Sequence, residues 1–262
     1  MKIPKRTLRS GGIQGSRATR WIFVGPAMLV VICLLIYPLL STLMYSFTNK
    51  TMIRNDFDVV GLQNYIDILT DGDFYSAFGH TLLWTLFSVL GQLIVGFIGA
   101  LALNRVQNKV AKNLFRIFAI IPWAFPAIAT AMTWKWLLNG IHGFVPTLLR
   151  DLGITPELIQ FLSDKNLVLP TLIFINIWFG APLILVNVYA ALQTIPRDQY
   201  EAAQIDGASS WQSFRYVTAP HIRTVVGLLV VLRTVWVFNN FDIIYMITGG
   251  GPAGASSTMP IF

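Results

Sequence analysis

The chain has 262 residues, of which 55% are hydrophobic and only 12% are charged, and its mean hydropathy is +0.62. A soluble domain carries about a quarter charged residues, so this composition excludes an ordinary soluble protein. The net charge of +7 is not interpreted as nucleic-acid binding, because the basic residues gather beside apolar runs, as in membrane proteins.

Long runs without charged residues predict membrane-spanning helices, because each reaches the roughly 18–20 apolar residues that cross a bilayer. The runs are 21–49, 74–104, 117–134 and 166–196. A fifth apolar stretch, 225–247, is interrupted by Arg233 and Asp242. We therefore predict an all-α, polytopic membrane helical bundle with five spans.

The first run follows a basic tail, residues 1–20, and a secretory signal peptide is the alternative interpretation. Its apolar part is longer than the apolar region of a signal peptide, and no small-residue cleavage site follows, which favours a retained helix. The single cysteine, Cys33, lies in this run, so no internal disulfide can form.

The distribution of basic residues predicts the orientation. They are concentrated in the tail, in the loop 105–116 and in the loop 197–223, and they are sparse in the loops 50–73 and 139–165. Because basic loops face the cytoplasm, we predict a cytoplasmic N-terminus. The C-terminal end of the five spans is then extracytoplasmic.

Prolines and loop residues predict two local features. Pro122 and Pro126 lie four residues apart in the third run and are expected to open that helix locally. The loop 139–165 is long enough for a short helix, expected around 155–162, where Pro156 suits a first helical turn.

The polar segment between the fourth and fifth apolar stretches predicts a helix–turn–helix. Residues 197–206 favour a helix, and Gly207 suits its left-handed end. Ser209 and Gln212 form a capping box that starts a second helix, which Pro220 is expected to end.

Large aromatic side chains lie on one face of that second helix. Trp211, Phe214 and Arg215 fall at helical spacing, so their side chains share a face. Such a pair either packs under neighbouring helices or fits a partner's groove, and the residues alone favour neither.

The same segment resembles the EAA loop of permeases from binding-protein-dependent ABC importers. The resemblance rests on Glu201-Ala202-Ala203, on Gly207 and on Val217-Thr218-Ala219-Pro220, where Val217 and Ala219 replace the family's Ile and Leu. Further motifs resemble the maltose-type, carbohydrate-uptake branch. They are Gly61-Leu62-x-Asn64-Tyr65, Pro122-Trp123-Ala124-x-Pro126, Ala191-Leu192-Gln193-x-Ile195-Pro196, and Phe238-Asn239-x-Phe241-Asp242 followed by Gly249-Gly250-Gly251-Pro252.

The resemblance implies a transmembrane domain, residues 21–262, with a coupling loop at 193–222. This loop would dock on a cytoplasmic ATPase subunit, with Glu201 as the charged contact, Gly207 as the turn, and Trp211 and Phe214 filling the partner's groove. The full set of expected coupling residues is Glu201, Ala202, Ala203, Asp206, Gly207, Trp211, Phe214 and Pro220. Because the family has six core helices, a sixth span is expected after the five predicted here.

Polar and aromatic residues inside the spans are candidates for substrate contacts, because such residues are costly in lipid. Three helical stripes stand out: Arg233, Trp236 and Asn240; Asn176, Phe179, Gly180 and Leu183; and Trp123 with Ala127. The resemblance implies that these positions line a mid-membrane sugar pocket. An aromatic ring can stack on a sugar ring, while Asn and Arg donate hydrogen bonds to hydroxyls.

The alternative for each of these residues is a packing role, because Trp and Asn in spans often hold helices together. Arg233 is equally well interpreted as a ligand of the substrate or as a structural residue bonded to neighbouring carbonyls. Lys135, near the end of its run, is expected to extend its charge to the membrane surface.

No cluster of His, Cys or acidic residues has metal-ligand spacing, and no glycine-rich loop resembles a nucleotide-binding site. The chain is therefore expected to be no enzyme and to bind no cofactor, with ATP and Mg²⁺ held by a separate ATPase subunit. The expected partners are a second permease, two ATPases, an extracytoplasmic solute-binding protein, the lipid bilayer and a sugar.

The resulting hypothesis is a permease subunit of an ATP-driven ABC importer in a bacterial inner membrane, moving an oligosaccharide or glycoside by alternating access. The alternative is an ion-coupled secondary transporter, which would need acidic residues in its spans and an internal repeat. Asp242 is the only acid within a predicted span, and no inverted repeat is visible. An intramembrane enzyme would need paired catalytic or metal-binding residues at one depth, and none is found.

Overall fold

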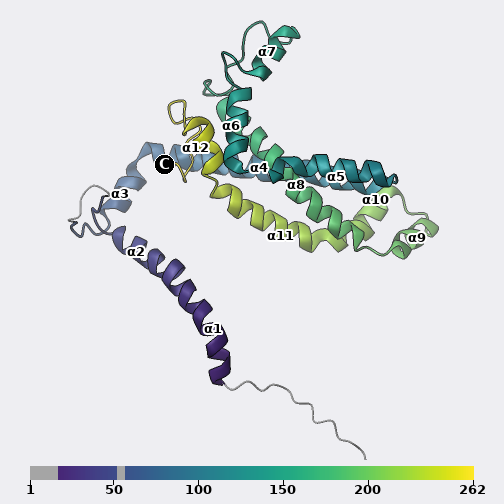
Figure 1. Ribbon diagram of the computed structural model, residues 1–262, viewed down its shortest axis with the longest axis horizontal. Helices are drawn as coiled ribbons and strands as arrows, with labels where there is room; N and C mark the ends of the chain where they lie inside the picture. The colour runs from purple at the N-terminus through teal and green to yellow at the C-terminus, as the bar shows by residue number, and fades with distance from the viewer. Residues whose placement is uncertain (1–16, 52–56) are drawn as a thin grey trace, which may run out of the picture. The chain divides into compact units, whose positions relative to one another are not determined.

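The computed structural model describes residues 17–51 and 57–262 (Figure 1). This part of the chain is helical, and its one extended pairing is an isolated bridge between Thr48 and Val59. The predicted all-α class is confirmed. The chain divides into two compact units, Met1–Asp71 and Gly72–Phe262, which are described separately. Of the predicted basic tail, residues 1–16 lie outside the described residues, and 17–20 begin the first helix.

The first unit contains one apolar helical path. α1 (Arg17–Val31) continues through a π-helical turn, η1 (Ile32–Ile36), into α2 (Tyr37–Tyr45). The segment Val24–Tyr45 has a mean hydropathy of 2.4 and no buried residue, so its side chains are free to face lipid or another subunit. The predicted first span is confirmed.

A short helix, α3 (Gln63–Thr70), completes the first unit and explains the Gly61-to-Tyr65 motif. The Asn64 side-chain amide donates to the carbonyls of Ser46 and Thr48, both at 2.9 Å, and the Tyr65 hydroxyl lies 2.7 Å from that of Ser46. These bonds hold the end of α2 against α3.

The second unit is built on three long helices that pack against one another: α4 (Gly72–Arg105), α8 (Val168–Gln193) and α11 (Ala219–Phe238). Shorter elements complete it. They are α5 (Lys109–Ala124), α6 (Ala127–Leu137), α7 (Phe144–Asp151), α9 (Arg197–Ile205), α10 (Ser210–Ser213), the π-helical turn η2 (Phe214–Thr218) and α12 (Asp242–Thr248). In Figure 1, α5 runs beside α8, and α9 and α10 lie at the end of the bundle away from α12.

Glycines let α4 and α8 approach closely. A β-carbon at Gly96 would lie 2.6 Å from the Ile184 β-carbon and 2.7 Å from the Ala181 carbonyl oxygen, and one at Gly99 would lie 2.6 Å from Leu185. Small residues at such crossings allow the close backbone packing that stabilises helix pairs in membranes.

The third predicted span is broken completely rather than opened locally. α5 ends at Ala124 and α6 begins at Ala127, with a bend of 93° between them. Phe125 and Pro126 have extended backbones, with ψ of 144° and 138°. The cause is Pro126, which has no N–H and disfavours a helical conformation at the preceding residue.

The fifth predicted span, 225–247, is also not one helix. α11 ends at Phe238, and α12 begins at Asp242. Asparagine side chains stabilise the break, because Asn239 donates to the Val235 carbonyl at 2.8 Å and the Asn240 oxygen accepts from the Ile243 N–H at 3.3 Å.

Within the described residues, four helical segments are long and apolar enough to cross a membrane, or five if α5 and α6 form one bent span. This agrees with the five predicted spans. The predicted helix at 155–162 is wrong: the helix of that loop is α7, which begins after Gly143 and is followed by Gly153 with φ of +71°. Residues 155–162 instead fold back, and the Gln160 amide donates to the Gly140 carbonyl at 3.1 Å.

Candidate coupling surface and substrate site

The predicted helix–turn–helix is confirmed between α8 and α11. α9 ends in a Schellman arrangement, in which the Gly207 N–H donates to the Gln204 carbonyl at 3.0 Å and the Ala208 N–H to the Ala203 carbonyl at 2.9 Å. Gly207 has φ of +75°, a conformation that glycine adopts without strain.

The predicted capping box at the start of α10 is also present. The Ser209 N–H donates to Oε1 of Gln212 at 2.7 Å, and the Gln212 N–H donates to Oγ of Ser209 at 3.3 Å. Both bonds satisfy donors that the first helical turn would leave unpaired.

The prediction that Pro220 ends the second helix is wrong. α10 continues through η2 directly into α11, where Pro220 occupies the first turn. In η2 the Ala219 N–H donates to the Phe214 carbonyl, five residues earlier, which widens the helix. We attribute the continuity to this wide turn, which accommodates the proline ring without breaking the path.

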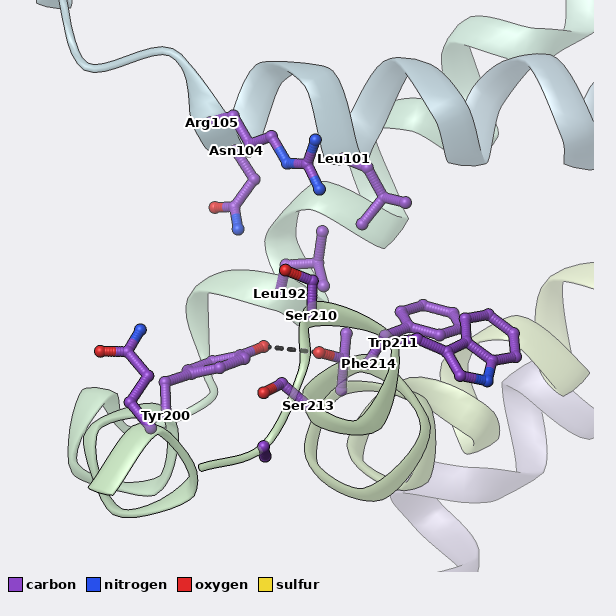
Figure 2. A pocket seen from close by; sticks show the side chains of 12 residues that line it. Leu101, Asn104, Arg105, Leu192, Tyr200, Ser210, Trp211, Ser213 and Phe214 are labelled. Carbon is purple, nitrogen blue, oxygen red and sulfur yellow. Dashed lines mark hydrogen bonds between the residues drawn. The ribbon is translucent and has the colours of Figure 1, made fainter. Parts of the chain in front are cut away.

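The two short helices are tied together and border a cavity of about 590 Å³ (Figure 2). The hydroxyls of Tyr200 on α9 and Thr218 in η2 lie 2.8 Å apart. Figure 2 shows Leu101, Asn104 and Arg105 of α4 on the opposite side of this space. The end of α4 and the coupling loop therefore face each other across a hollow.

The two aromatic residues that were predicted to fill a partner's groove differ in how exposed they are. Trp211 and Phe214 stack, with ring centroids 5.6 Å apart, so the predicted shared face is confirmed. Phe214 is half-buried and meets the edge of Phe97 on α4 at 6.0 Å, whereas Trp211 is 66% exposed. Phe214 thus packs within the chain, and Trp211 presents its ring outward.

The remaining predicted coupling residues lie mostly on the surface of this loop. Ala203 is half-buried; the exposed ones are Glu201, Ala202, Asp206, Gly207 and Pro220. Glu201 forms no salt bridge within the part of the chain that the structure describes. Its side chain is exposed.

The predicted substrate residues Arg233 and Asn176 lie in a buried polar cluster. Arg233 is 6% exposed, and its Nε donates to Oε1 of Gln92 on α4 at 2.7 Å. The Gln92 Nε2 then donates to the Asn176 carbonyl on α8 at 2.9 Å. Gly180 leaves space for both side chains, since a β-carbon there would collide with Gln92 and Arg233. The structure therefore gives Arg233 a structural partner, although this partner is an amide side chain rather than a main-chain carbonyl.

Sequence reasoning missed Gln92, which is fully buried in the middle of the second apolar run. The signal that could have identified it is its polarity, since an amide inside a span needs a partner on another helix.

The other predicted substrate residues are exposed or half-buried. Trp123 and Trp236 are about half exposed, and the Arg233 guanidinium carbon lies 5.8 Å from the Trp236 ring centroid. Half-buried positions are held by Ala127, Phe179, Leu183 and Asn240. Asn240 lies beyond the end of α11, so the predicted helical stripe through Arg233, Trp236 and Asn240 is wrong at its last member.

Lys135 of α6 is exposed, and its ammonium donates to the Met246 carbonyl in the last turn of α12 at 3.2 Å, while its extension to the membrane surface stays a prediction. A cation is favourable there, because the C-terminal end of a helix carries a partial negative charge. No group of three or more His, Cys, Asp or Glu residues suited to a metal ion occurs among the described residues.

Comparison with known proteins places these features in a family. Residues 92–262 match the family described as binding-protein-dependent transport system inner membrane component. The chain is 32% identical over 241 residues to the trehalose/maltose transport system permease protein of Thermococcus litoralis, covering 92% of this chain and 80% of that protein. It is 34% identical over 258 residues to a maltodextrin transport system permease protein of Streptococcus pneumoniae, covering 91% of this chain and 59% of the relative.

A similar fold occurs in the crystal structure of a bacterial ABC transporter that imports the acidic polysaccharide alginate. The TM-score is 0.78 at 22% identity, and the match covers 91% of this chain and 79% of that one. A family match over more than half of the residues, together with relatives above 30% identity, settles the assignment. The chain belongs to the family of inner membrane components of binding-protein-dependent transport systems.

Proposed function

We propose that this permease carries an oligosaccharide or glycoside into a bacterial cell by alternating access, driven by ATP hydrolysis on separate subunits. The observation that supports the cargo is the agreement among relatives, which are named for trehalose or maltose, maltodextrin and galactooligosaccharides. Mid-span Asn and Trp side chains are chemically suited to such a cargo, since they combine hydrogen bonds with a stacking surface.

The coupling loop is proposed to dock on a cytoplasmic ATPase through α9 and α10. Three features of the loop support this proposal. Glu201 is an accessible acid, Trp211 is an exposed ring, and the Tyr200–Thr218 bond holds the helix pair together. Because α10 is continuous with α11 through η2, a displacement of the pair would move the membrane helix with it.

The complete importer is proposed to contain a second permease, two ATPases and an extracytoplasmic solute-binding protein in the inner membrane. ATP and Mg²⁺ would be bound by the ATPases. The loops 50–73 and 139–165 would face the solute-binding protein. An alginate transporter with the same fold has been crystallised in complex with its periplasmic protein, which supports this type of assembly.

Charge reversal at Glu201 tests the coupling role. Glu201→Lys should leave the protein inserted while lowering sugar uptake and co-purification of the ATPase, because two like charges would face each other. Disrupting a charged contact at an interface costs about 2 kcal/mol or more of binding free energy, so we expect roughly a thirtyfold loss of affinity for the ATPase. Glu157→Lys makes the same charge change at an exposed site outside the loop and should retain the ATPase. Normal transport by Glu201→Lys would contradict the proposed role.

Alanine substitutions test the substrate site. Trp236→Ala and Asn240→Ala should each abolish or strongly reduce uptake while the assembled transporter is still recovered, because stacking area or a hydroxyl partner is lost. Trp136→Ala removes the same ring from a site on α6 that is 75% exposed, and its uptake should be unchanged. Full uptake by the Trp236 and Asn240 variants would exclude them from the sugar path.

A further inference from the structure

An apolar groove with a basic rim lies between α5 and α8, where Gln193 is its one lining residue from the coupling loop and none of its lining residues is a predicted coupling or substrate residue. Its volume is about 320 Å³, at the lower end of the range of roughly 300–1,000 Å³ for small-molecule sites. Leu103 and Leu185 are buried in its wall, and Val186 is half-buried there. The lining is therefore suited to a hydrocarbon chain.

The rim of the groove is polar. Arg116 of α5 lines it together with Tyr189 of α8, and the guanidinium carbon lies 5.9 Å from the tyrosine ring centroid. Beyond Tyr189, the Gln193 amide donates to Oδ1 of Asn104 at 2.7 Å. The groove thus ends in groups that can interact with a polar headgroup.

Two further basic residues share the Arg116 side of α5. Lys109 and Lys112 precede Arg116 by seven and four residues, so all three fall on one helical face. No acidic residue occurs in 105–124 or in α8, and none of the three basic side chains forms a salt bridge within the described residues. This positive charge is therefore not neutralised by the chain itself.

The surroundings of the groove indicate which molecule covers it. The apolar residues Leu114, Ile117 and Phe118 of α5 are 50–67% exposed, so an apolar surface of a membrane protein continues beside the basic stripe. A ligand that matches both surfaces needs an apolar chain and a negative charge. Basic pockets between membrane helices are known sites for anionic lipid headgroups.

We propose that the groove binds one anionic phospholipid. Its acyl chain lies along Val186, with the buried Leu103 and Leu185 beneath it, and its phosphate lies against Arg116 and Lys112, with Tyr189 beside it. The site does not depend on the identity of the transported sugar.

Lipid titration tests the proposal. The full chain, purified with its co-purifying subunits, would be titrated with phosphatidylglycerol, with phosphatidylcholine of the same acyl composition, and with inorganic phosphate, and bound lipid counted by native mass spectrometry. We expect phosphatidylglycerol to bind more tightly than phosphatidylcholine. Lys112→Gln combined with Arg116→Gln should weaken phosphatidylglycerol binding about twenty-five-fold, because each basic residue near an anionic headgroup contributes about fivefold.

Three further variants serve as controls for this test. Lys165→Gln combined with Arg223→Gln removes the same charge from exposed sites of the loop 139–165 and α11 and should leave lipid binding unchanged. Val186→Trp retains every charge but fills the groove, so it should weaken both lipids. Arg116→Lys keeps the charge and should retain the preference for phosphatidylglycerol.

Each of the following results would overturn the proposal. They are equal affinity for the two lipids, equal losses in the two double variants, undiminished lipid binding by Val186→Trp, and displacement of the lipid by inorganic phosphate. Equal affinity would show that the basic rim does not recognise the headgroup charge, and displacement would assign the groove to a free anion.

Discussion

At the scale of single residues, the contact between Arg233 and Gln92 explains how a charge is accommodated inside a span. Arginine in the apolar region is costly unless its donors are paired. Gln92 accepts from Arg233 and donates to the Asn176 carbonyl, so one amide links α11, α4 and α8. Gly180 leaves the space that this arrangement occupies.

Removing Gln92 should destabilise the bundle. In Gln92→Leu, Arg233 loses its acceptor, and a buried unsatisfied group costs roughly 1–3 kcal/mol. The Asn176 carbonyl loses its second donor but lies within the helix α8. We expect a lower free energy of unfolding in detergent, measured by denaturant titration. The double variant Gln92→Leu with Arg233→Met should recover part of this loss, because the buried charge is then absent.

Gln193→Leu is the matched control for this prediction. Gln193 also donates to a side-chain oxygen, that of Asn104, but at an exposed position, so its loss should cost less than about 0.5 kcal/mol. Equal stability of Gln92→Leu and Gln193→Leu would show that the buried link has no structural importance.

At the scale of elements, the crossing of α4 and α8 depends on glycines that the apolar pattern does not distinguish. Gly96 faces a main-chain carbonyl at Ala181, which cannot move as a flexible side chain can. Gly79 lies on the same helix with no atom within 4 Å of a β-carbon built there. The two positions therefore differ in packing while sharing a helix.

The two alanine substitutions should have opposite effects on stability. Gly96→Ala should destabilise the chain by about 1–3 kcal/mol, as expected for overpacking. Gly79→Ala should stabilise it by up to about 1 kcal/mol, because alanine is the better helix former. Thermal unfolding followed by circular dichroism would measure both, and a Gly96→Ala variant as stable as the parent would contradict the close crossing.

At the scale of the whole molecule, the orientation in the membrane follows from the distribution of basic residues and remains a prediction. Cys33, the single cysteine, lies within the apolar path of the first unit. Because lipid excludes charged reagents, it should resist a membrane-impermeant maleimide in intact cells. In a Cys33→Ser background, Gln204→Cys and Lys165→Cys place exposed thiols in the coupling loop and in the loop 139–165.

Labelling from the two sides of the membrane should then differ. Lys165→Cys should react in intact cells, whereas Gln204→Cys should react only after the membrane is opened, because the basic side is cytoplasmic. Reaction of Gln204→Cys in intact cells would reverse the proposed topology and with it the site of ATPase docking.

Local patterns were sufficient for much of the fold. The charge-free runs predicted the spans, because a bilayer imposes a minimum apolar length. Gly207, Ser209 and Gln212 predicted the turn and cap of the coupling loop, since such bonds join residues only a few positions apart. By contrast, Pro126 and Pro220 are both prolines in helical surroundings, yet one breaks a span and the other lies in a continuous path.

What the sequence by itself determined is therefore the membrane class, the number of apolar crossings and the shape of the coupling loop. The first two depend on the length of apolar segments that a bilayer requires, and the third depends on bonds between residues a few positions apart. Only the tertiary structure decided that Arg233 bonds to Gln92, 141 residues away, and that Phe214 packs on Phe97. The physical reason is that such contacts depend on how separate helices cross, and crossings are set by packing across helices rather than by the order of residues within one.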